Sequence, residues 1–263
     1  MRIDGSTILV TGATGGIGHA IARTLAKRGA SLVLTGRKRE PLEALERELS
    51  ARTIAADLAD PASIERFVAE AGAVDGLVAN AALPATGPVL EFSPSDVDRL
   101  LAVNLRSPIV LSAALARGMV ERRRGHVVFI GSLASKTASP GGAMYSATKF
   151  GLRGFAHGFR ADLHGTGVGV SIVLPGFIRD AGMFADAKVE LPPGVRTSSP
   201  EEVADAVARA IEQDVGEITV APVEMRLMTT IASVAPMMGA ALQRLAGGDR
   251  ISRELAAGQR HKR

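Results

Sequence analysis

The sequence predicts an α/β fold built on a doubly wound parallel β-sheet, and three observations support this fold class. Short, β-branched apolar runs alternate along the chain with longer stretches of helical periodicity. The apolar runs contain few polar residues, which is typical of parallel strands covered by helices on both faces. A glycine-rich turn directly follows the first run and opens a helical stretch.

About seven strands and six helices are expected, in strict alternation over most of the chain. The clearest strands lie at residues 7–10, 31–35, 75–79, 126–130 and 168–174, and weaker ones lie near 53–55 and 217–220. The helices are expected at residues 17–27, 41–49, 61–70, 94–119, 145–163 and 201–211. Pro41, Pro61 and Pro94 each stand near a helix start, where the missing amide costs nothing.

Residues 1–221 are expected to form a single domain, followed by a C-terminal helical extension at residues 222–263. The chain has 263 residues, near the upper end of what one hydrophobic core organises. The extension is rich in Ala, Met and Leu between residues 225 and 245. A packed helix is the leading interpretation, with a cover over an active site, a subunit interface and a membrane-surface contact as open alternatives.

Composition narrows the chemistry and the partners. The absence of cysteine excludes disulfides, a thiolate nucleophile and cysteine-bound metals, so redox chemistry would need a bound cofactor. No secretory signal and no apolar run of roughly 20 residues is present, which predicts a soluble, cytoplasmic protein. The net charge is +4, but its cations are scattered and one tyrosine without tryptophan offers little base stacking, so no nucleic-acid partner is expected.

The turn at residues 11–18 has the features of a phosphate-binding turn. Gly12, Gly16 and Gly18 allow a sharp turn, close approach to a pyrophosphate and tight packing of the next helix on the sheet. The helix start offers free amides and the positive end of its dipole to an anion. The spacing has one more residue between the first two glycines, and one fewer between the last two, than the usual G-x-G-x-x-G. The expected architecture is therefore a Rossmann-type sheet that binds a dinucleotide.

The end of the second strand indicates which dinucleotide is bound. An NAD site would place an acid there to hold the ribose 2′-hydroxyl, but Arg37, Lys38 and Arg39 follow the strand. Arg37 can bond a 2′-phosphate through two donors. Cations at a helix start oppose the helix dipole, so an ordinary charged helix start is the weaker explanation. NADP is favoured over NAD.

Tyr145 and Lys149 form the candidate acid–base pair. Their spacing of four residues at the start of an expected helix places both on one face. A neighbouring ammonium favours the phenolate and so should lower the pKa of the tyrosine from its reference value of about 10. The same spacing is common in structural helices, and it gains weight here because Tyr145 is the only tyrosine in the chain.

Two further polar residues are candidates for the site. Ser132 follows the strand at 126–130, so its hydroxyl lies at the carboxyl edge of the sheet, where such folds bind ligands. Asn104 interrupts an apolar helical stretch, as a local kink or a buried hydrogen-bond partner. The histidines lack paired ligand spacing, so no metal site is expected, and Ser132 lacks the G-x-S-x-G setting of a hydrolase.

In combination these motifs resemble the classical short-chain dehydrogenases/reductases over roughly residues 5–220. Besides the glycine turn and the Tyr145–Lys149 pair, the matching motifs stand in the family's order along the chain: Asp57-Leu58, Asn80-Ala81-Ala82, Asn104, Ser132 and Pro175-Gly176. The resemblance implies an oxidoreductase that transfers a hydride between a nicotinamide cofactor and a carbonyl or alcohol substrate.

The resemblance also implies roles for individual residues. Tyr145 would donate the proton in reduction, Lys149 would hold the nicotinamide ribose and lower the tyrosine pKa, and Ser132 would orient the substrate carbonyl. Asn104 would support a water relay to the lysine, and Asn80 would stabilise the sheet edge beside the cofactor. Asp57 would accept a hydrogen bond from the adenine amino group. The implied cofactor-binding residues are Gly12, Thr14, Gly16, Ile17, Gly18, Arg37, Asp57, Leu58, Asn80, Lys149, Pro175, Gly176 and Ile178.

Two positions depart from the family pattern. Ala82 replaces the glycine of the family's Asn-Ala-Gly, and alanine would be strained if the position needed a positive φ. The family's threonine after Pro-Gly, which holds the nicotinamide carboxamide, is missing. Asp180 in its neighbourhood can accept a hydrogen bond from the carboxamide but cannot donate one.

The expected substrate is a lipophilic ketone or aldehyde, or the corresponding alcohol. The apolar content of the segments that should wall the pocket, residues 133–144 and 177–195, suits such a substrate, although Lys136, Arg179 and Lys188 leave a carboxylate or phosphate open. A cofactor-binding regulator without turnover is the alternative function. The family resemblance further implies a homodimer or homotetramer assembled through the helices at 94–119 and 145–163.

Overall fold

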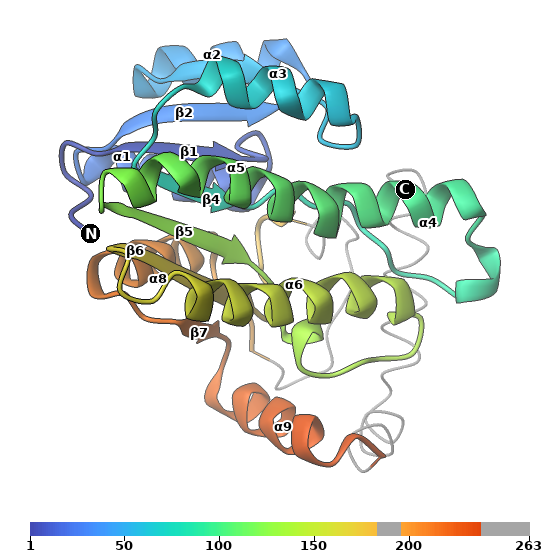
Figure 1. Ribbon diagram of the computed structural model, residues 1–263. Coiled ribbons are helices and arrows are strands. Elements are labelled where there is room, and N and C mark those ends of the chain that lie inside the picture. Colours follow the sequence, from blue (N-terminus) through green and yellow to red (C-terminus); the bar gives the residue numbers. More distant parts are fainter. Residues whose placement is uncertain (183–195, 238–263) are drawn as a thin grey trace.

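The computed structural model describes residues 1–182 and 196–237, and within them the strands form one parallel sheet (Figure 1). Its seven strands lie in the order β3-β2-β1-β4-β5-β6-β7. In chain order they are β1 (Thr7–Thr11), β2 (Ser31–Gly36), β3 (Arg52–Ala55), β4 (Gly76–Ala79), β5 (Gly125–Ile130), β6 (Val168–Pro175) and β7 (Glu217–Val220). The predicted doubly wound Rossmann-type sheet is confirmed.

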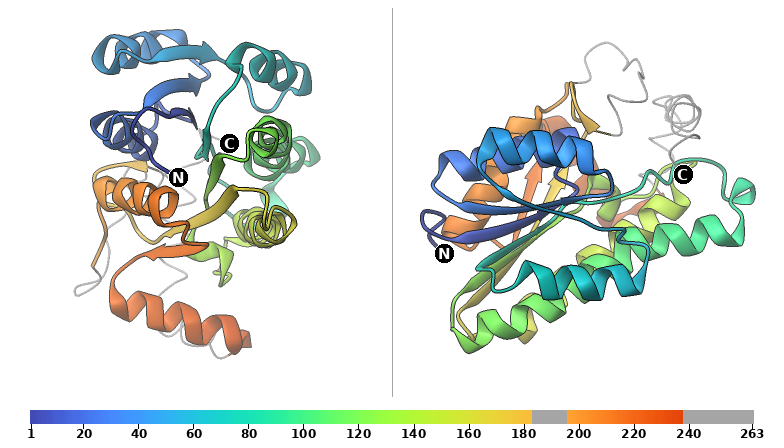
Figure 2. Two further views of the ribbon diagram at one scale, coloured as in Figure 1. Left: turned by 60° about the vertical axis from the view of Figure 1, so that its left-hand side comes forward. Right: turned by 90° about the horizontal axis from the view of Figure 1, so that it is seen from above.

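Helices cover both faces of the sheet, as the left view of Figure 2 shows. They are α1 (Gly16–Lys27), α2 (Arg39–Leu49), α3 (Pro61–Ala71), α4 (Pro94–Leu101), α5 (Ser107–Glu121), α6 (Ala143–Asp162), α8 (Pro200–Gln213) and α9 (Val223–Val234). One core lies under α1, α2 and α8, and the other lies under α3, α5 and α6. Successive side chains of β1 pack into opposite cores: those of Ile8 and Val10 into the first and that of Leu9 into the second.

The connection order brings the carboxyl ends of several strands to one edge. β1 pairs with β2 on one side and with β4 on the other, and all these pairs are parallel. The chain therefore winds outward in opposite directions from β1, and the loops that follow β1 and β4 diverge. Such a switch point leaves a crevice beyond the carboxyl ends of the strands, where ligands bind in open α/β sheets.

The helix expected at residues 94–119 is interrupted. It consists of α4, the single π-helical turn η2 (Ala102–Arg106) and α5. By length and composition, the combined stretch Pro94–Glu121 would also suit a membrane span, because its most apolar window of 18 residues has a mean hydropathy of 1.3. Half of this window is buried inside the protein, however, and one such helix is weak evidence for a membrane span.

The start of the expected C-terminal extension is the helix α9. Thr229 and Ala232 are its buried residues, whereas Leu227 and Val234 are 61% and 83% exposed. The apolar run predicted at 225–245 continues beyond position 237, and that part lies outside the described residues. The division of the chain at residue 221 stays a prediction.

Candidate active site

The glycines of the turn after β1 stand where no larger residue fits. Gly12 has φ +64°, and a Cβ there would lie 2.8 Å from the Ala81 Cα. A Cβ on Gly18 would overlap the Gly12 carbonyl oxygen, and one on Gly16 would overlap the Ala181 side chain. The turn is thus packed between the loops that follow β4 and β6, so its backbone lies at the crevice.

The first turn of α1 has the donor groups that a phosphate needs. Gly15 stands at the N-cap of α1 without a side-chain hydrogen bond, whereas Asp60, Ser93 and Ser199 cap α3, α4 and α8 with their side chains. The first-turn amides of a helix have no intrahelical acceptor, and no acidic residue lies in this turn. Thr14 and Gly16 are exposed beside these amides, and Ile17 is half-buried.

Arg37 lies beside this turn, at the end of β2. The Ala13 amide donates to the Thr35 carbonyl at 3.0 Å, which fixes the turn against the strand. A Cβ on Gly36 would lie 3.1 Å from the Thr14 Oγ1. Arg37 and its two cationic neighbours are exposed and form no ion pair within residues 1–182 and 196–237. These residues fit a cofactor that carries a phosphate on its adenosine ribose.

Asp57 and Leu58, after β3, offer different groups to a cofactor. Asp57 is exposed, and its Oδ1 accepts a hydrogen bond of 2.9 Å from the Ala59 amide. Because one oxygen is engaged locally, the other remains for the adenine amino group that the family resemblance assigns to it. Leu58 is buried in the core, so only its backbone can contact a ligand.

Asn80 ties the ends of β1 and β4 together. Its Nδ2 donates to the Thr11 and Gly12 carbonyls at 3.0 and 3.1 Å, and its amide donates to the Thr11 Oγ1 at 3.0 Å. The neighbouring Ala82 is absent from the non-glycine residues with positive φ. The alanine at this family glycine position is therefore unstrained.

Tyr145 and Lys149 lie together in the first two turns of α6, as their spacing predicts. The edge-to-face contact of Phe155 with Phe129, at 5.7 Å between ring centroids, packs α6 on β5. The Lys149 Nζ lies 5.6 Å from the Tyr145 ring centroid and donates to the Ile130 carbonyl at 2.9 Å. Lys149 is only 3% exposed, and this burial lowers its pKa to about 8.

The pKa of Tyr145 moves opposite to the prediction. Burial raises the pKa of Tyr145 to about 12, and a hydrogen bond with Ser132 opposes this rise. The expectation that Lys149 lowers this pKa is wrong, because the loss of hydration destabilises the phenolate more than the neighbouring groups stabilise it. Ser132 stands at the N-cap of the short turn η3 (Leu133–Ser135), where its Oγ accepts from the Ala134 amide at 3.1 Å.

Asn104 lies in the π-helical turn η2 and is 1% exposed. Its Oδ1 accepts from the Leu83 amide at 2.7 Å, and its Nδ2 donates to the Leu83 carbonyl at 2.9 Å. The asparagine thus pairs with the backbone of the loop after β4. One hydrogen of Nδ2 and one lone pair of Oδ1 remain for the implied water relay.

The segment after β6 begins with residues of the predicted cofactor site. The Gly176 amide donates to the Val220 carbonyl at 2.9 Å. Ile178 is buried in the core and pairs with Ser198, so only its backbone can face a cofactor. Asp180 has φ +64°, is exposed and pairs with Arg179 at 3.4 Å. Lys188 and the remainder of the predicted wall, residues 183–195, lie outside the described residues.

Lys136 is engaged within the protein. Its Nζ lies 2.7 Å from a carboxylate oxygen of Glu217, and its side chain is 16% exposed. A substrate carboxylate or phosphate would have to displace this partner. Glu217 was not among the predicted site residues, since nothing local in its strand marks it.

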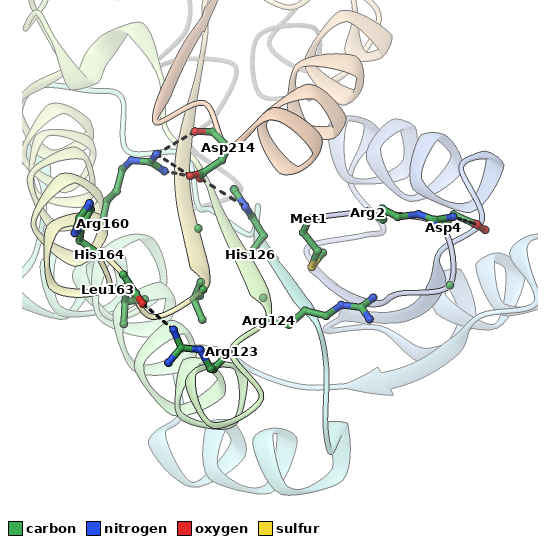
Figure 3. A pocket seen from close by; sticks show the side chains of 16 residues that line it. Met1, Arg2, Asp4, Arg123, Arg124, His126, Arg160, Leu163, His164 and Asp214 are labelled. Carbon is green, nitrogen blue, oxygen red and sulfur yellow. Dashed lines mark hydrogen bonds and ion pairs between the residues drawn. The ribbon is translucent and has the colours of Figure 1, made fainter.

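A second hollow, of about 910 Å³, opens at the amino ends of β5 and β6 (Figure 3). Arg124 there donates to the Ser6 hydroxyl at 3.0 Å, and Arg123 donates to the Gly165 carbonyl at 3.4 Å. None of the predicted site residues lines this hollow. No group of three or more His, Asp and Glu side chains suited to a metal occurs in the described part of the chain.

A sequence model of the family described as short chain dehydrogenase matches residues 6–191. The chain belongs to this family of oxidoreductases. It is 32% identical to the ketoacyl reductase HetN of Nostoc sp., over 89% of this chain and 86% of that protein. It is 34% identical to the 3-oxoacyl-[acyl-carrier-protein] reductase FabG of Escherichia coli, over 83% and 95% of the two chains.

Further members of the family are described with the predicted cofactor. The NADP-dependent 3-hydroxy acid dehydrogenase YdfG of Salmonella typhi is 40% identical over 65% of this chain and 72% of its own. A metagenomic short-chain oxidoreductase solved in complex with NADP is 36% identical, covers 84% of this chain and 99% of its own, and has a TM-score of 0.71. These relatives agree with NADP as the cofactor predicted from Arg37.

Proposed function

We propose that this family member is an NADP-dependent carbonyl reductase in which Tyr145 is the proton donor. One observation carries the proposal: the only tyrosine of the chain, the buried Lys149 and Ser132 meet at the carboxyl end of β5, on the same edge of the parallel sheet as the glycine turn. When bound, the cofactor supplies the hydride for the carbonyl carbon.

The residues of the chain handle the proton. A pKa of about 12 keeps the Tyr145 phenol protonated at neutral pH, so it is ready to donate to a more basic alkoxide oxygen. The Ser132 hydroxyl bonds the same substrate oxygen, and the Lys149 ammonium stabilises the phenolate that remains. Asn104 holds the loop after β4 and supports the water relay that returns a proton to Lys149. Near neutral pH the phenol is therefore already in the protonation state that carbonyl reduction requires.

The proposed substrate is a ketone or aldehyde with a lipophilic remainder. The backbone of Gly176 is closely surrounded by apolar groups, since a Cβ there would lie 3.0 Å from the Met225 Sδ and 3.3 Å from a Leu133 methyl. A 3-oxoacyl compound, of the kind named for HetN and FabG, combines a ketone with an apolar chain and is the first substrate to test.

We also propose a cytoplasmic homodimer or homotetramer assembled through the faces of α4, α5 and α6. Leu101 and Phe150 on these helices are 37% and 44% exposed, and such an assembly would cover them. Light scattering coupled to size-exclusion chromatography gives the assembly size. A monomer would contradict this assignment.

The decisive experiment compares the wild-type protein with Tyr145→Phe. NADPH and NADH are titrated separately, and 3-oxoacyl thioesters, simple ketones and alcohols are then screened by nicotinamide absorbance. Tyr145→Phe should bind NADPH nearly normally and lose kcat by roughly 10²- to 10⁴-fold, because it lacks the acid. Retained turnover would refute the assignment of Tyr145. Cofactor binding without turnover by the wild-type protein would favour the regulator instead.

A further inference from the structure

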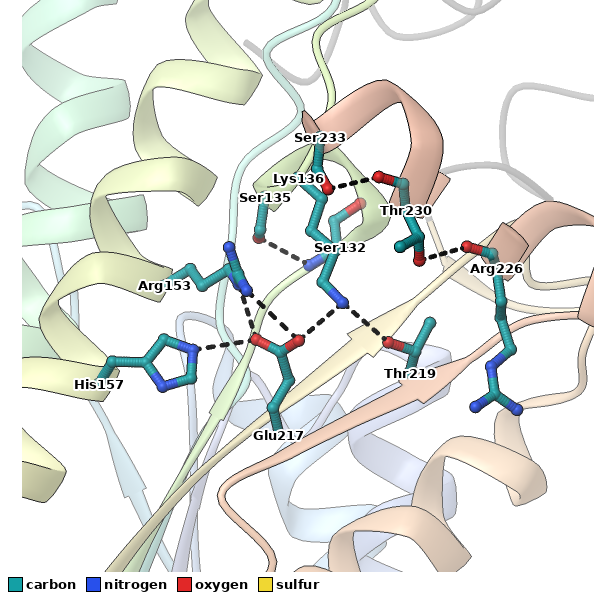
Figure 4. A network of polar contacts seen from close by, with 10 residues as sticks. All are labelled: Ser132, Ser135, Lys136, Arg153, His157, Glu217, Thr219, Arg226, Thr230 and Ser233. Atoms are coloured by element: carbon teal, nitrogen blue, oxygen red, sulfur yellow. Dashed lines mark hydrogen bonds and ion pairs between the residues drawn. The ribbon is translucent and has the colours of Figure 1, made fainter. Parts of the chain in front are cut away.

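A partly buried carboxylate at the start of β7 holds cations from two other elements (Figure 4). The Glu217 side chain is 19% exposed, and its Oε1 lies 2.7 Å from the Lys136 Nζ. Its Oε2 lies 2.6 Å from the Arg153 Nε and 3.0 Å from the His157 Nε2. Burial opposes the ionisation of this carboxylate, but hydrogen bonds from Arg153, Lys136 and His157 outweigh it and lower the pKa of Glu217 to about 2.

The partners of Glu217 belong to the two elements that carry the proposed acid and its hydrogen-bond partner. On α6, Arg153 and His157 continue the four-residue spacing of Tyr145 and Lys149. The four side chains therefore lie along one face of the helix. Lys136 follows η3, four residues after Ser132. Figure 4 shows the Lys136 side chain reaching from this turn down to β7.

β7 is suited to join these elements because its two faces differ. Ile218 and Val220 enter the core under α8, whereas Glu217 and Thr219 point to the α6 side. The Lys136 Nζ contacts both of them, since it also donates to the Thr219 Oγ1 at 3.4 Å. The edge of the sheet beside α6 is thus closed by a polar network rather than by apolar packing.

We propose that Glu217 is a positioning residue that fixes the Ser132 turn against the Tyr145 helix and so sets the Ser132–Tyr145 hydrogen bond. The inference rests on the carbonyl chemistry proposed above. Of the groups drawn in Figure 4, only the Glu217 carboxylate bonds both Lys136, which follows η3, and Arg153 of α6. Small displacements of groups that orient a substrate reduce rates strongly, so the tie acts on catalysis more than on stability.

Asp214 offers a matched control because it also ties α6 to the region of β7. It lies just before β7, and its carboxylate accepts from Arg160 of α6 at 2.7 and 3.0 Å. Asp214 therefore also joins α6 to the β7 region, but it makes no contact with η3. Asp214→Asn removes an ion pair of α6 and leaves the Ser132 turn untouched.

The first test measures kinetics. Glu217→Gln keeps the shape of the side chain and should lower kcat about ten-fold, with the Kd of NADPH unchanged. Lys136→Met removes the tie to η3 alone and should reproduce this loss, and the double variant should be no slower than either single one. Asp214→Asn should lower Tm with kcat unchanged. Equal kcat in Glu217→Gln and Asp214→Asn, or additive losses in the double variant, would overturn the inference.

The second test does not depend on turnover. Tyr145 is the only tyrosine and the chain has no tryptophan, so ultraviolet absorbance of the phenolate follows Tyr145 alone. Because the Ser132 bond favours ionisation of the phenol, Glu217→Gln and Lys136→Met should shift this titration to higher pH, and Asp214→Asn should not. An unchanged titration in both folded variants would overturn the inference. A wild-type protein that reduces no carbonyl would sink the proposed function, and this titration would still decide the role of Glu217.

Discussion

At the amino ends of β5 and β6, buried and partly buried polar side chains satisfy one another. The His126 Nε2 and the Ser171 Oγ lie 2.8 Å apart, and both side chains are nearly inaccessible. Asp214 lies 4.0 Å from the other ring nitrogen of His126 and is held by Arg160. Each group in this cluster has a partner of matching chemistry.

At the carboxyl ends of the same strands, polar groups lack, among the described residues, some of the hydrogen-bond and ion-pair partners that they could hold. The buried Lys149 ammonium donates to one backbone carbonyl, and no carboxylate pairs with it in the described part of the chain. On the same edge of the sheet, after β1, the α1 helix begins without a side-chain cap. A donor or charge without a partner lowers the stability of the protein alone. The same group adds to the binding free energy when a ligand supplies the partner. These open positions lie at the end of the sheet where we propose that the cofactor and the substrate bind.

The largest effect is expected for Lys149→Met. Burial lowers the Lys149 pKa to about 8, so the unfolded chain binds the proton more tightly and stability rises with pH from about 8 to about 10.5. Near pH 7 the buried charge therefore costs about 3 kcal/mol. Lys149→Met should gain a large part of this in urea unfolding at pH 7 while losing carbonyl reduction. A variant less stable than the wild-type protein would contradict a destabilising charge at Lys149.

Acid should act on the opposite end of the sheet. Burial lowers the His126 pKa to about 4, so the unfolded state takes up the proton first, and stability is lost as pH falls from about 6.5 towards 4. The loss from this group amounts to about 3 kcal/mol when complete. His126→Gln should unfold with a weaker dependence on pH across this window, measured by urea unfolding at several pH values. An identical pH dependence in both proteins would contradict the assignment to His126.

Arg37→Ala tests whether the Arg37 guanidinium binds the 2′-phosphate of the cofactor. Loss of a charged hydrogen-bond donor should raise the Kd of NADPH roughly 10- to 100-fold, as expected for 1.5–3 kcal/mol. The Kd of NADH, which lacks the 2′-phosphate, should stay the same and serves as the internal control. Fluorescence titration measures both. Equal weakening of the two cofactors would show a structural defect rather than a lost phosphate contact.

The smallest effect is expected for Ala82→Gly, which restores the family residue. Ala82 has no positive φ, so glycine relieves no strain and adds freedom to the unfolded chain. The variant should lose roughly 0.5–1 kcal/mol of stability and keep its affinity for NADPH. A gain in Tm would indicate strain at this position.

Much of the fold and the site could be predicted because their signals are local. Apolar runs located the seven strands, and the glycine turn, Ser132 and the Tyr145–Lys149 spacing needed only neighbouring residues. The π-helical turn at Asn104 could not be read from periodicity, since it depends on pairing with the distant backbone of Leu83. The link between Lys136 and Glu217 was hidden for the same reason.

The tyrosine pKa shows a second limit. The spacing of Tyr145 and Lys149 gives their proximity but not the solvent that folding removes from both. Desolvation depends on all the elements packed around the pair, so the direction of the shift needed the assembled structure.

The contact of Gly16 with Ala181 has a consequence for how the protein should be assayed. Residues from the first turn of the chain and from the segment after β6 pack against each other at the phosphate end of the crevice. This surface exists only when the strands between them are assembled. Cofactor binding is thus linked to folding of the entire sheet, and saturating NADPH should raise Tm with the logarithm of its concentration. A thermal melt with added nucleotide then reports foldedness and ligand preference in one measurement, before any substrate is known.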